Sequence, residues 1–256
     1  ELEKILVQVR KSVEENLKLN MPVQTALQKA CETMNSSGEF DNAALQNALG
    51  LALKAVWASK WTYRAYLSRQ ARNIPDSSLY MAVLVQPVVK DAEFAFVLHT
   101  KDPLSGDSTK LFGELVWGLG ESLVGSFPGR ALSFVADKAT CKLDKVMSFP
   151  SKPMGFFAST GSVFVRSDSN GEDLEKFAGA GLYDSVACGL IEHRYVDYTS
   201  CRLFTDPSYL DELVSKLTKC GVDVENVMTK DKVAQDIEGV VDKNGEITVV
   251  QSRPQI

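Results

Sequence analysis

The stretch QDIEGVVDKNGEITVVQSRPQI, residues 235–256, predicts a β-hairpin at the C-terminal end of the chain. Asn244-Gly245 is the strongest short-range signal for a two-residue type I′ turn. A turn centred on this pair brings together residues whose numbers sum to 489, so that Lys243 faces Glu246 and Val240 faces Val249. The alternative is a turn longer than two residues, which would change this pairing.

The same register gathers polar residues at the open end of the hairpin. Glu238 is expected opposite Gln251, and Asp236 opposite Arg253, and alternation along each strand puts all four on one face. The register also assigns three apolar residues to that face: Val240, Ile247 and Val249. Because the Cβ atoms of cross-strand partners lie about 5 Å apart, two carboxylates, an amide and a guanidinium should form one patch.

This patch has a chemical interpretation and a structural alternative. The oxygen ligands of Glu238 and Gln251 suit Mg²⁺, which usually takes one or two protein ligands together with phosphate oxygens. Arg253 beside them could bind a phosphate through two parallel hydrogen bonds. The alternative is a surface Asp–Arg ion pair with an incidental Glu–Gln neighbour, because exposed charge pairs are common on hairpins.

The rest of the chain predicts an α+β fold. Residues 1–72 show mainly helical periodicity, with one long helical pattern over 43–72. Short runs rich in Val, Leu and Phe predict strands within 79–89, 92–100, 110–117 and 161–169. A helix is expected from an N-cap at Asp206 to an end at Gly221. We expect a helical segment over 1–75 and a second domain, rich in strands, over 76–256.

Composition excludes several classes of protein. The formal net charge of −5 argues against a broad nucleic-acid surface, and no apolar run reaches the roughly 20 residues of a membrane helix. The five cysteines show no metal-binding spacing, which indicates reduced thiols. The chain begins at Glu1 without an initiator Met, so we expect a fragment of a longer protein.

Other candidate residues lie at the ends of strands. Arg166, Ser167 and Asp168 follow an apolar strand and precede a glycine-rich loop, an arrangement that suits a ligand with several phosphoryl oxygens; the alternative is a capped surface turn. Glu114 and Glu121 flank the segment GLGESLVGSFPGR, which fits neither standard phosphate-binding glycine pattern. They could face a cation or ribose hydroxyls, or be solvated.

The two histidines lack the partners of a catalytic triad. We expect His99, on an apolar strand, to be a histidine with satisfied hydrogen bonds, and His193 to lie at the surface. The tryptophans of VWASKW, Trp57 and Trp61, have the spacing of residues in a helix core.

Five stretches together carry a family resemblance: MAVLVQPVV, HTKDPLSGD, GLGESLVG, RSDSNGEDLEKFAGAGLYDS and QDIEGVV…VVQSRP. Over residues ~55–256 the chain resembles the nucleotide-binding domain of the pyruvate, phosphate dikinase and phosphoenolpyruvate synthase superfamily. The RSDS motif follows GLGE here, whereas in phosphoenolpyruvate synthases it precedes the Val-Gln strand. This order, with VWASKW, PGRALSF and FPSKPMG, is similar to the C-terminal domain of the α-glucan, water dikinases.

The resemblance implies an ATP-grasp-like α+β fold, with ATP between a strand-rich and a more helical subdomain. It implies a metal contact for Glu238 and Gln251, and catalytic phosphate contacts for Arg166 and Arg253. It places Gln86 near the adenine, and Lys101 where relatives often carry Arg. The expected nucleotide-binding residues are Gln86, Lys101, Glu114, Glu121, Arg166, Ser167, Asp236 and Arg253.

The resemblance also implies a reaction. Such dikinases use Mg-ATP to phosphorylate a histidine on a separate swivelling domain, expected upstream, and release AMP and phosphate. The expected partners are that domain and an α-glucan bound through other domains, without nucleic acid or membrane. The expected compartment is the plastid stroma, with the cytoplasm as the alternative. The alternative functions are the nucleotide-binding domain of a phosphoenolpyruvate or pyruvate dikinase and a non-catalytic nucleotide-binding module.

Overall fold

The computed structural model describes residues 1–35, 41–89, 91–124, 127–158, 162–174, 177–179, 181–189, 191–228 and 233–255. The chain divides into two compact units. The helical unit comprises Glu1–Val88 and Ala158–Ile191, and the sheet unit comprises Val89–Phe157 and Glu192–Gln255. Among the residues just given, no helix is long and apolar enough to span a membrane.

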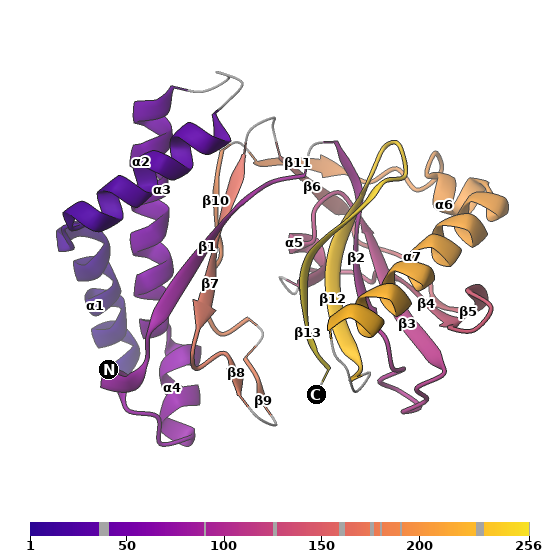
Figure 1. Ribbon diagram of the computed structural model, residues 1–256, viewed down its shortest axis with the longest axis horizontal. Coiled ribbons are helices and arrows are strands. Elements are labelled where there is room, and N and C mark those ends of the chain that lie inside the picture. Colours follow the sequence, from indigo (N-terminus) through magenta and orange to yellow (C-terminus); the bar gives the residue numbers. More distant parts are fainter. Residues whose placement is uncertain are drawn as a thin grey trace. The chain divides into compact units, whose positions relative to one another are not determined.

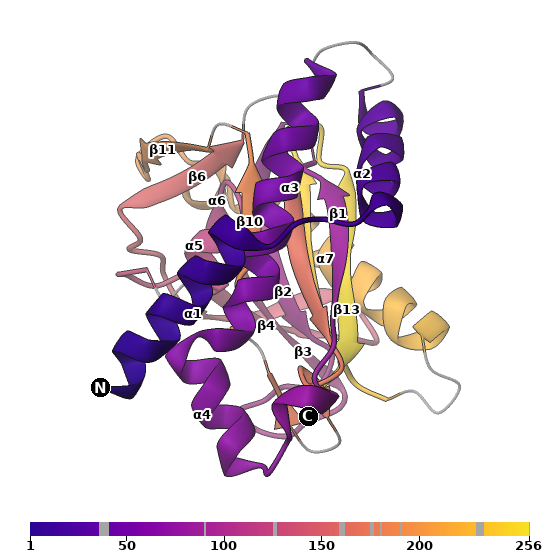
Figure 2. The ribbon, with the colours of Figure 1, turned by 90° about the vertical axis from the view of Figure 1, so that its left-hand side faces the viewer.

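The helical unit contains four α-helices among its described residues, and they lie beside a small antiparallel sheet (Figures 1 and 2). The helices are α1 (Leu2–Asn16), α2 (Met21–Met34), α3 (Asn42–Ala58) and α4 (Tyr63–Ala71), with 3-10 turns η1 (Ser59–Trp61) and η2 (Asp76–Ser78). The sheet has the order β1 (Met81–Pro87), β7 (Val163–Ser169), β10 (Val186–Cys188). A short hairpin joins β8 (Asp173–Leu174) and β9 (Phe177–Ala178).

Helix α3 connects the N-terminal segment to this sheet. Its buried residues Leu49, Leu53 and Val56 pack in one cluster with Val163 and Val165 of β7. The N-terminal helices therefore share a core with strands from later in the chain.

The helical pattern over 43–72 forms two helices, not the single helix that its periodicity predicts. The side chain of Ser59 donates to the carbonyl of Val56 at 2.7 Å as α3 ends. Thr62 then begins α4, accepting from the amide of Ala65 at 3.3 Å. Hydroxyl side chains that bond to nearby backbone groups favour such helix ends.

The sheet unit is built on a six-stranded antiparallel sheet with the order β13-β12-β2-β3-β4-β5. The strands are β2 (Ala92–His99), β3 (Lys110–Trp117), β4 (Leu132–Asp137), β5 (Lys142–Ser148), β12 (Gln235–Asp242) and β13 (Ile247–Pro254). Smaller elements are α5 (Glu121–Val124), α6 (Arg202–Thr205), β6 (Met154–Ala158) and its partner β11 (Ile191–Tyr195). Helix α7 (Pro207–Met228) lies across one face of the sheet (Figure 1).

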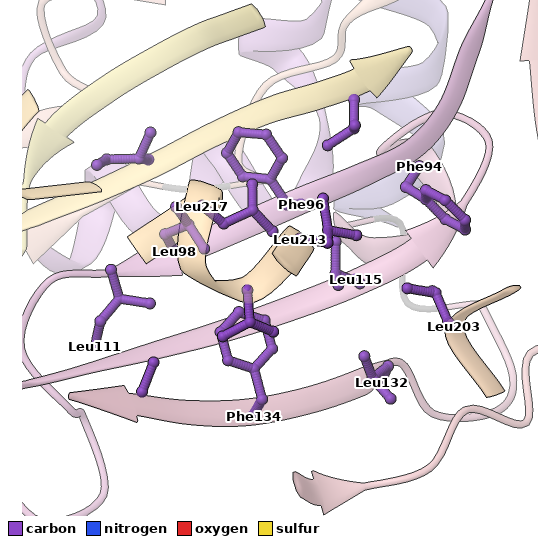
Figure 3. Packing of buried hydrophobic residues seen from close by; sticks show 14 residues of the cluster. Phe94, Phe96, Leu98, Leu111, Leu115, Leu132, Phe134, Leu203, Leu213 and Leu217 are labelled. Carbon is purple, nitrogen blue, oxygen red and sulfur yellow. The ribbon is translucent and has the colours of Figure 1, made fainter. Parts of the chain in front are cut away.

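Alternate strand residues form the core beneath α7. Phe96, Leu98 and Leu115 of the sheet pack with Leu213 and Leu217 of the helix (Figure 3). One face of the sheet is therefore apolar and packed against α7, and polar side chains of the strands belong on the opposite face.

Helix α7 begins as predicted but ends later. The Asp206 carboxylate accepts from the amide of Tyr209 at 3.1 Å, which confirms the N-cap. Gly221 does not end the helix, which continues to Met228. A Cβ at Gly221 would lie 2.6 Å from Leu111 Cδ1, so the glycine provides close packing of helix against sheet.

Candidate functional site

The C-terminal hairpin has the predicted pairing at its open end. Asp236 lies opposite Arg253, and Glu238 lies opposite Gln251. Near the turn the prediction is wrong by one residue, because Val240 faces Thr248 instead of Val249.

The turn is one residue longer than its Asn-Gly signal predicts. The amide of Gly245 donates to the carbonyl of Asp242 at 2.9 Å, and the amide of Asp242 donates to the carbonyl of Glu246 at 3.0 Å. Gly245 has a φ of +81°. These contacts describe a three-residue connection in which glycine occupies the left-handed position.

A β-bulge corrects the offset that the longer turn introduces. The register shifts between Glu238 and Gly239, where β13 carries the extra residue. The two one-residue offsets cancel, so the polar pairs are those that the sequence predicts. Val249 and Ile247 lie on the other face, contrary to the prediction, and Ile247 packs against the core beneath α7.

The registers of the neighbouring strands extend the patch across the sheet. Glu238 pairs with Val97 of β2, which pairs with Glu114 of β3. Asp236 pairs with His99, which pairs with Phe112. Partners in a ladder point to one side, so these rows share the face away from α7. We call this surface the polar face, made of His99, Glu114, Asp236, Glu238, Gln251 and Arg253.

Arg253 and Asp236 form an ion pair on the polar face. Nε and Nη2 of Arg253 donate to the same oxygen, Oδ2 of Asp236, at 3.0 and 2.8 Å. The two side chains are only 15% and 14% exposed. The pair is thus largely removed from solvent, unlike the exposed ion pair that was the alternative interpretation.

His99 lies on the other side of Asp236. Its Nδ1 is 3.8 Å from Oδ1 of Asp236, and both atoms are buried without a hydrogen-bond partner in the described part of the chain. The prediction of a histidine with satisfied hydrogen bonds is therefore wrong for Nδ1.

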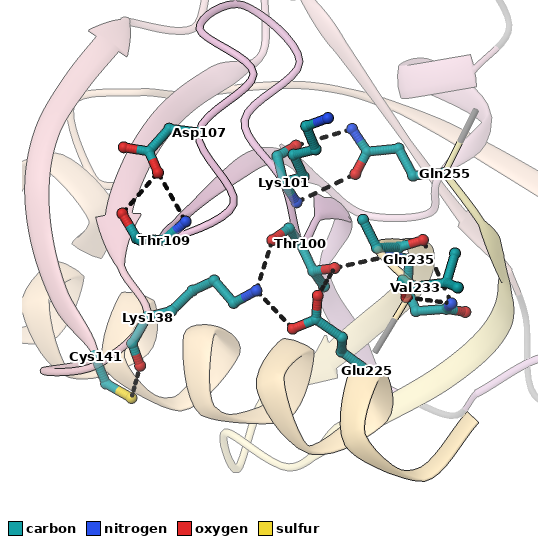
Figure 4. Close-up of polar contacts among 11 residues, drawn as sticks. Thr100, Lys101, Asp107, Thr109, Lys138, Cys141, Glu225, Val233, Gln235 and Gln255 are labelled. Atoms are coloured by element: carbon teal, nitrogen blue, oxygen red, sulfur yellow. Dashed lines mark hydrogen bonds and ion pairs between the residues drawn. The ribbon is translucent and has the colours of Figure 1, made fainter. Parts of the chain in front are cut away.

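A buried polar network holds the strand ends next to the polar face (Figure 4). Thr100 Oγ1 donates to Oε1 of Glu225 at 3.1 Å, and Lys138 Nζ contacts Oε2 of that carboxylate at 2.5 Å. Thr100 Oγ1 also accepts from the amide of Gln235 at 2.8 Å. The network therefore connects Glu225 of α7 to Thr100, directly after β2, and to Gln235, the first residue of β12 and the neighbour of Asp236.

Gln255, directly after β13, forms hydrogen bonds to the backbone of Lys101 (Figure 4). Its Nε2 donates to the carbonyl of Lys101 at 2.8 Å, and its Oε1 accepts from the Lys101 amide at 3.2 Å. Lys101 therefore has a structural backbone role beside its exposed side chain. Sequence reasoning missed the buried network and the contacts of Gln255. One sign of the network in the sequence was Glu225, a charged residue that follows Leu217 and Gly221 at four-residue spacing and therefore lies on the packed side of α7.

Lys152 is a further residue that sequence reasoning missed. It is buried, and its Nζ donates to the carbonyl of Phe127 at 2.8 Å. Burial lowers the pKa of this ammonium group, and the charge of Glu114 acts in the opposite direction. The effect links Lys152 to the polar face. Glu121, by contrast, is half-buried at the start of α5 and lies outside the two rows.

Two of the predicted residues of the helical unit, Arg166 and Gln86, lie together. Arg166 pairs with Leu84 in the ladder, which places it on the same face as Gln86, and its Nη1 donates to Gln86 Oε1 at 3.4 Å. Ser167 points to the opposite face, where its Oγ donates to Glu172 at 3.3 Å. The structure brings Arg166 together with Gln86 and leaves Ser167 apart. Residues 175, 176 and 180 of the glycine-rich loop fall outside the described residues.

The polar face offers oxygen ligands for one hard cation. Glu238 and Gln251 supply a carboxylate and an amide directly opposite each other. Within the described ranges no group of three or more His, Cys, Asp or Glu residues could hold a metal. A donor set of two protein oxygens fits Mg²⁺, which completes its shell with phosphate and water, better than a metal held by protein alone.

Comparison with known proteins identifies the class of the chain. The family model for the pyruvate phosphate dikinase AMP/ATP-binding domain matches residues 6–148, more than half of the chain. The chain belongs to this family, as its motifs predict, and its mixed helix and sheet architecture confirms the expected ATP-grasp-like α+β fold.

The relatives define the class more closely. The chain is 49% identical over 206 residues to the chloroplastic α-glucan water dikinase of Citrus reticulata, and 48% identical to that of Solanum tuberosum. Each match covers 80% of this chain and 14% of the relative. A phosphoenolpyruvate synthase of Aeropyrum pernix is 29% identical over 79% of the chain and 24% of its own length. The predicted resemblance to the glucan dikinases is confirmed, and the chain spans about one seventh of their length.

Proposed function

We propose that the chain is the ATP-binding domain of an α-glucan, water dikinase, and that its polar face binds the polyphosphate of Mg-ATP. The observation that carries the proposal is the convergence of Asp236, Glu238, Gln251 and Arg253 on the face away from α7. Family membership supports the nucleotide, and the relatives at 49% and 48% identity support the glucan as final acceptor.

Each residue of the patch has a proposed role. Glu238 and Gln251 hold Mg²⁺, which when bound offsets charge on the phosphate oxygens. Asp236 orients the guanidinium of Arg253 toward the polyphosphate. In the helical unit, Arg166 is proposed as a second phosphate contact and Gln86 as an adenine contact. The remaining proposed nucleotide contacts are Lys101, Glu114, Glu121 and Ser167.

The proposed reaction needs a group that this chain does not supply. ATP and water would give AMP, phosphate and a phosphohistidine on another domain of the full-length protein: the γ-phosphoryl group goes to water, and the β-phosphoryl group goes to the histidine and then to the glucan. His99 points toward Asp236 and His193 stacks edge-on against Phe156, so neither is proposed as the acceptor. The chloroplastic relatives support the plastid stroma as the compartment.

The alternative acceptor is pyruvate, as in the more distant phosphoenolpyruvate synthases. The difference between 49% and 29% identity favours the glucan. We expect the chain, incubated with ATP labelled at the β-phosphate and with glucan, to leave the glucan unlabelled, because the acceptor histidine lies elsewhere. Stable label on the glucan would contradict this assignment of roles.

Calorimetric titration tests the metal site. We expect ATP to bind more tightly with Mg²⁺ than without it, and Glu238→Ala to remove this difference because the carboxylate ligand is lost. Glu246→Ala is the matched control, since it removes the same charge from an exposed position of the same hairpin. Absence of ATP binding, or equal effects of the two substitutions, would refute the proposal.

A further inference from the structure

His99 and Asp236 leave two complementary polar atoms facing each other. They are partners in the ladder between β2 and β12, and Nδ1 lies 3.8 Å from Oδ1. Both atoms are buried and have no hydrogen-bond partner in the described part of the chain. The other carboxylate oxygen, Oδ2, accepts both N–H groups of Arg253.

Two buried unsatisfied atoms are expensive in free energy. A buried donor or acceptor that is left unpaired has lost its hydrogen bonds to water without a replacement. A shift of about 1 Å brings Nδ1 and Oδ1 into hydrogen-bond distance. A bridging water needs a wider gap, about 4.5 Å for two hydrogen bonds at a tetrahedral angle. A direct hydrogen bond is thus the arrangement that removes both penalties.

The surroundings of His99 leave Asp236 as its partner. On β3 the ladder neighbour is Phe112, whose ring centroid lies 6.1 Å from that of His99. On the side of β12 and β13 the charged groups are Asp236 and, behind it, Arg253; Glu238 and Glu114 lie in the next row. The following residue, Thr100, is fixed by the buried network, which holds the backbone of His99 in place.

We propose that His99 is a positioning residue for Arg253, acting through an Nδ1–H donor bond to Oδ1 of Asp236. The terminal torsion of an aspartate is broad, so a carboxylate held through one oxygen can turn. A second bond on Oδ1 fixes the plane of the carboxylate and thereby the guanidinium bonded to Oδ2. The role of Arg253 rests on the proposed function, whereas the hydrogen bond of His99 does not.

The tautomer of His99 is the first test. Because an ionised carboxylate only accepts hydrogen bonds, the bond requires the proton on Nδ1. The chain has two histidines, so nitrogen NMR on the ¹⁵N-labelled chain, with His193→Gln to assign the signals, resolves His99 alone. At a pH where the ring is neutral we expect the Nδ1–H form. The Nε2–H form would overturn the inference, whether or not ATP binds.

Substitution supplies the second test. Asn places its amide nitrogen near the position of Nδ1, and Gln near that of Nε2. We expect His99→Asn to bind Mg-ATP within about 3-fold of the unsubstituted chain, and His99→Gln and His99→Leu to bind about 10-fold more weakly, as for one lost hydrogen bond to a charged group.

Thermal unfolding of each variant separates positioning from folding. If His99→Leu is unfolded, the comparison of the Asn and Gln variants decides. Equal affinities for these two would overturn the inference. If the unsubstituted chain fails to bind Mg-ATP, the proposed function fails, and the tautomer still decides the hydrogen bond.

Discussion

Charge balance on the polar face explains how one divalent cation would fit there. Glu114, Asp236 and Glu238 carry three negative charges, and Arg253 and Lys152 offset two of them. The contact of Arg253 is with Asp236, and the charge effect of Lys152 is with Glu114. Glu238, which lies opposite the amide of Gln251, is the carboxylate that we propose as the metal ligand. The remaining negative charge of the face would repel an anionic ligand unless a cation lay between them. Mg-ATP, in which Mg²⁺ accompanies the polyphosphate, meets this requirement.

The shape of the Arg253 side chain, as well as its charge, should matter. Arg253→Lys keeps one positive charge but loses the planar group that bonds to Asp236 through two nitrogens. We expect Mg-ATP affinity to fall by about 10- to 100-fold, the value of a charge-assisted hydrogen-bond pair. Calorimetry gives the affinity, with Lys243→Arg at the exposed turn as control. An affinity within about 2-fold of the unsubstituted chain contradicts the role of the guanidinium.

At the scale of elements, two phenylalanines of the main sheet that pack beneath α7 each lie opposite a glycine on the neighbouring strand. Gly239 lies opposite Phe96, and Gly113 lies opposite Phe134. A Cβ on Gly239 would lie 2.2 Å from Phe96 Cζ, and one on Gly113 2.3 Å from Phe134 Cζ. Each ring therefore occupies the space that a side chain at the glycine would fill, and both rings belong to the core beneath α7.

Adding a methyl group at Gly239 should disrupt this packing. We expect Gly239→Ala to lower the free energy of unfolding by about 1–3 kcal/mol, the usual cost of overpacking a core. The control is Gly120→Ala, because the nearest atom to a Cβ there is the Ala95 Cβ at 3.8 Å. Urea unfolding followed by circular dichroism measures both. Equal stability of the two variants would show that Phe96 moves aside at little cost.

For the molecule as a whole, acid should act first on the sheet unit. Five of its aspartates have a pKa lowered mainly by hydrogen bonds within their own turns: Asp102, Asp107, Asp137, Asp197 and Asp242. A folded pKa below the unfolded value stabilises the fold above the unfolded pKa, and this stability is lost as pH falls through the folded pKa. Burial raises the pKa of Glu93, which acts in the opposite direction.

Tryptophan fluorescence can compare the two units during acidification. Trp117 lies in the sheet unit, and Trp57 and Trp61 lie in the helical unit. We expect a chain with Trp57→Phe and Trp61→Phe to report unfolding, as pH falls below about 4, at a higher pH than a chain with Trp117→Phe. Coincident transitions, or earlier loss of the helical unit, would contradict the prediction.

Sequence reasoning recovered the parts of the structure that depend on near neighbours. The helices of the first 72 residues, the N-cap at Asp206 and the main strands follow from periodicity and capping, which act over a few residues. The pairing of Asp236 with Arg253 was correct only because the bulge cancelled an error at the turn. Whether the connection that contains Gly245 has two or three residues depends on the twist of the two strands, which the local sequence does not specify.

By itself the sequence determined the class of fold and the family, because these depend on local patterns and on motifs read along the chain. Tertiary structure alone decided the faces of Ile247 and Val249, the continuation of α7 beyond Gly221, and the meeting of His99 with Asp236. Each of these depends on packing or pairing between strands and helices far apart in sequence, and such contacts exist only once the chain has folded.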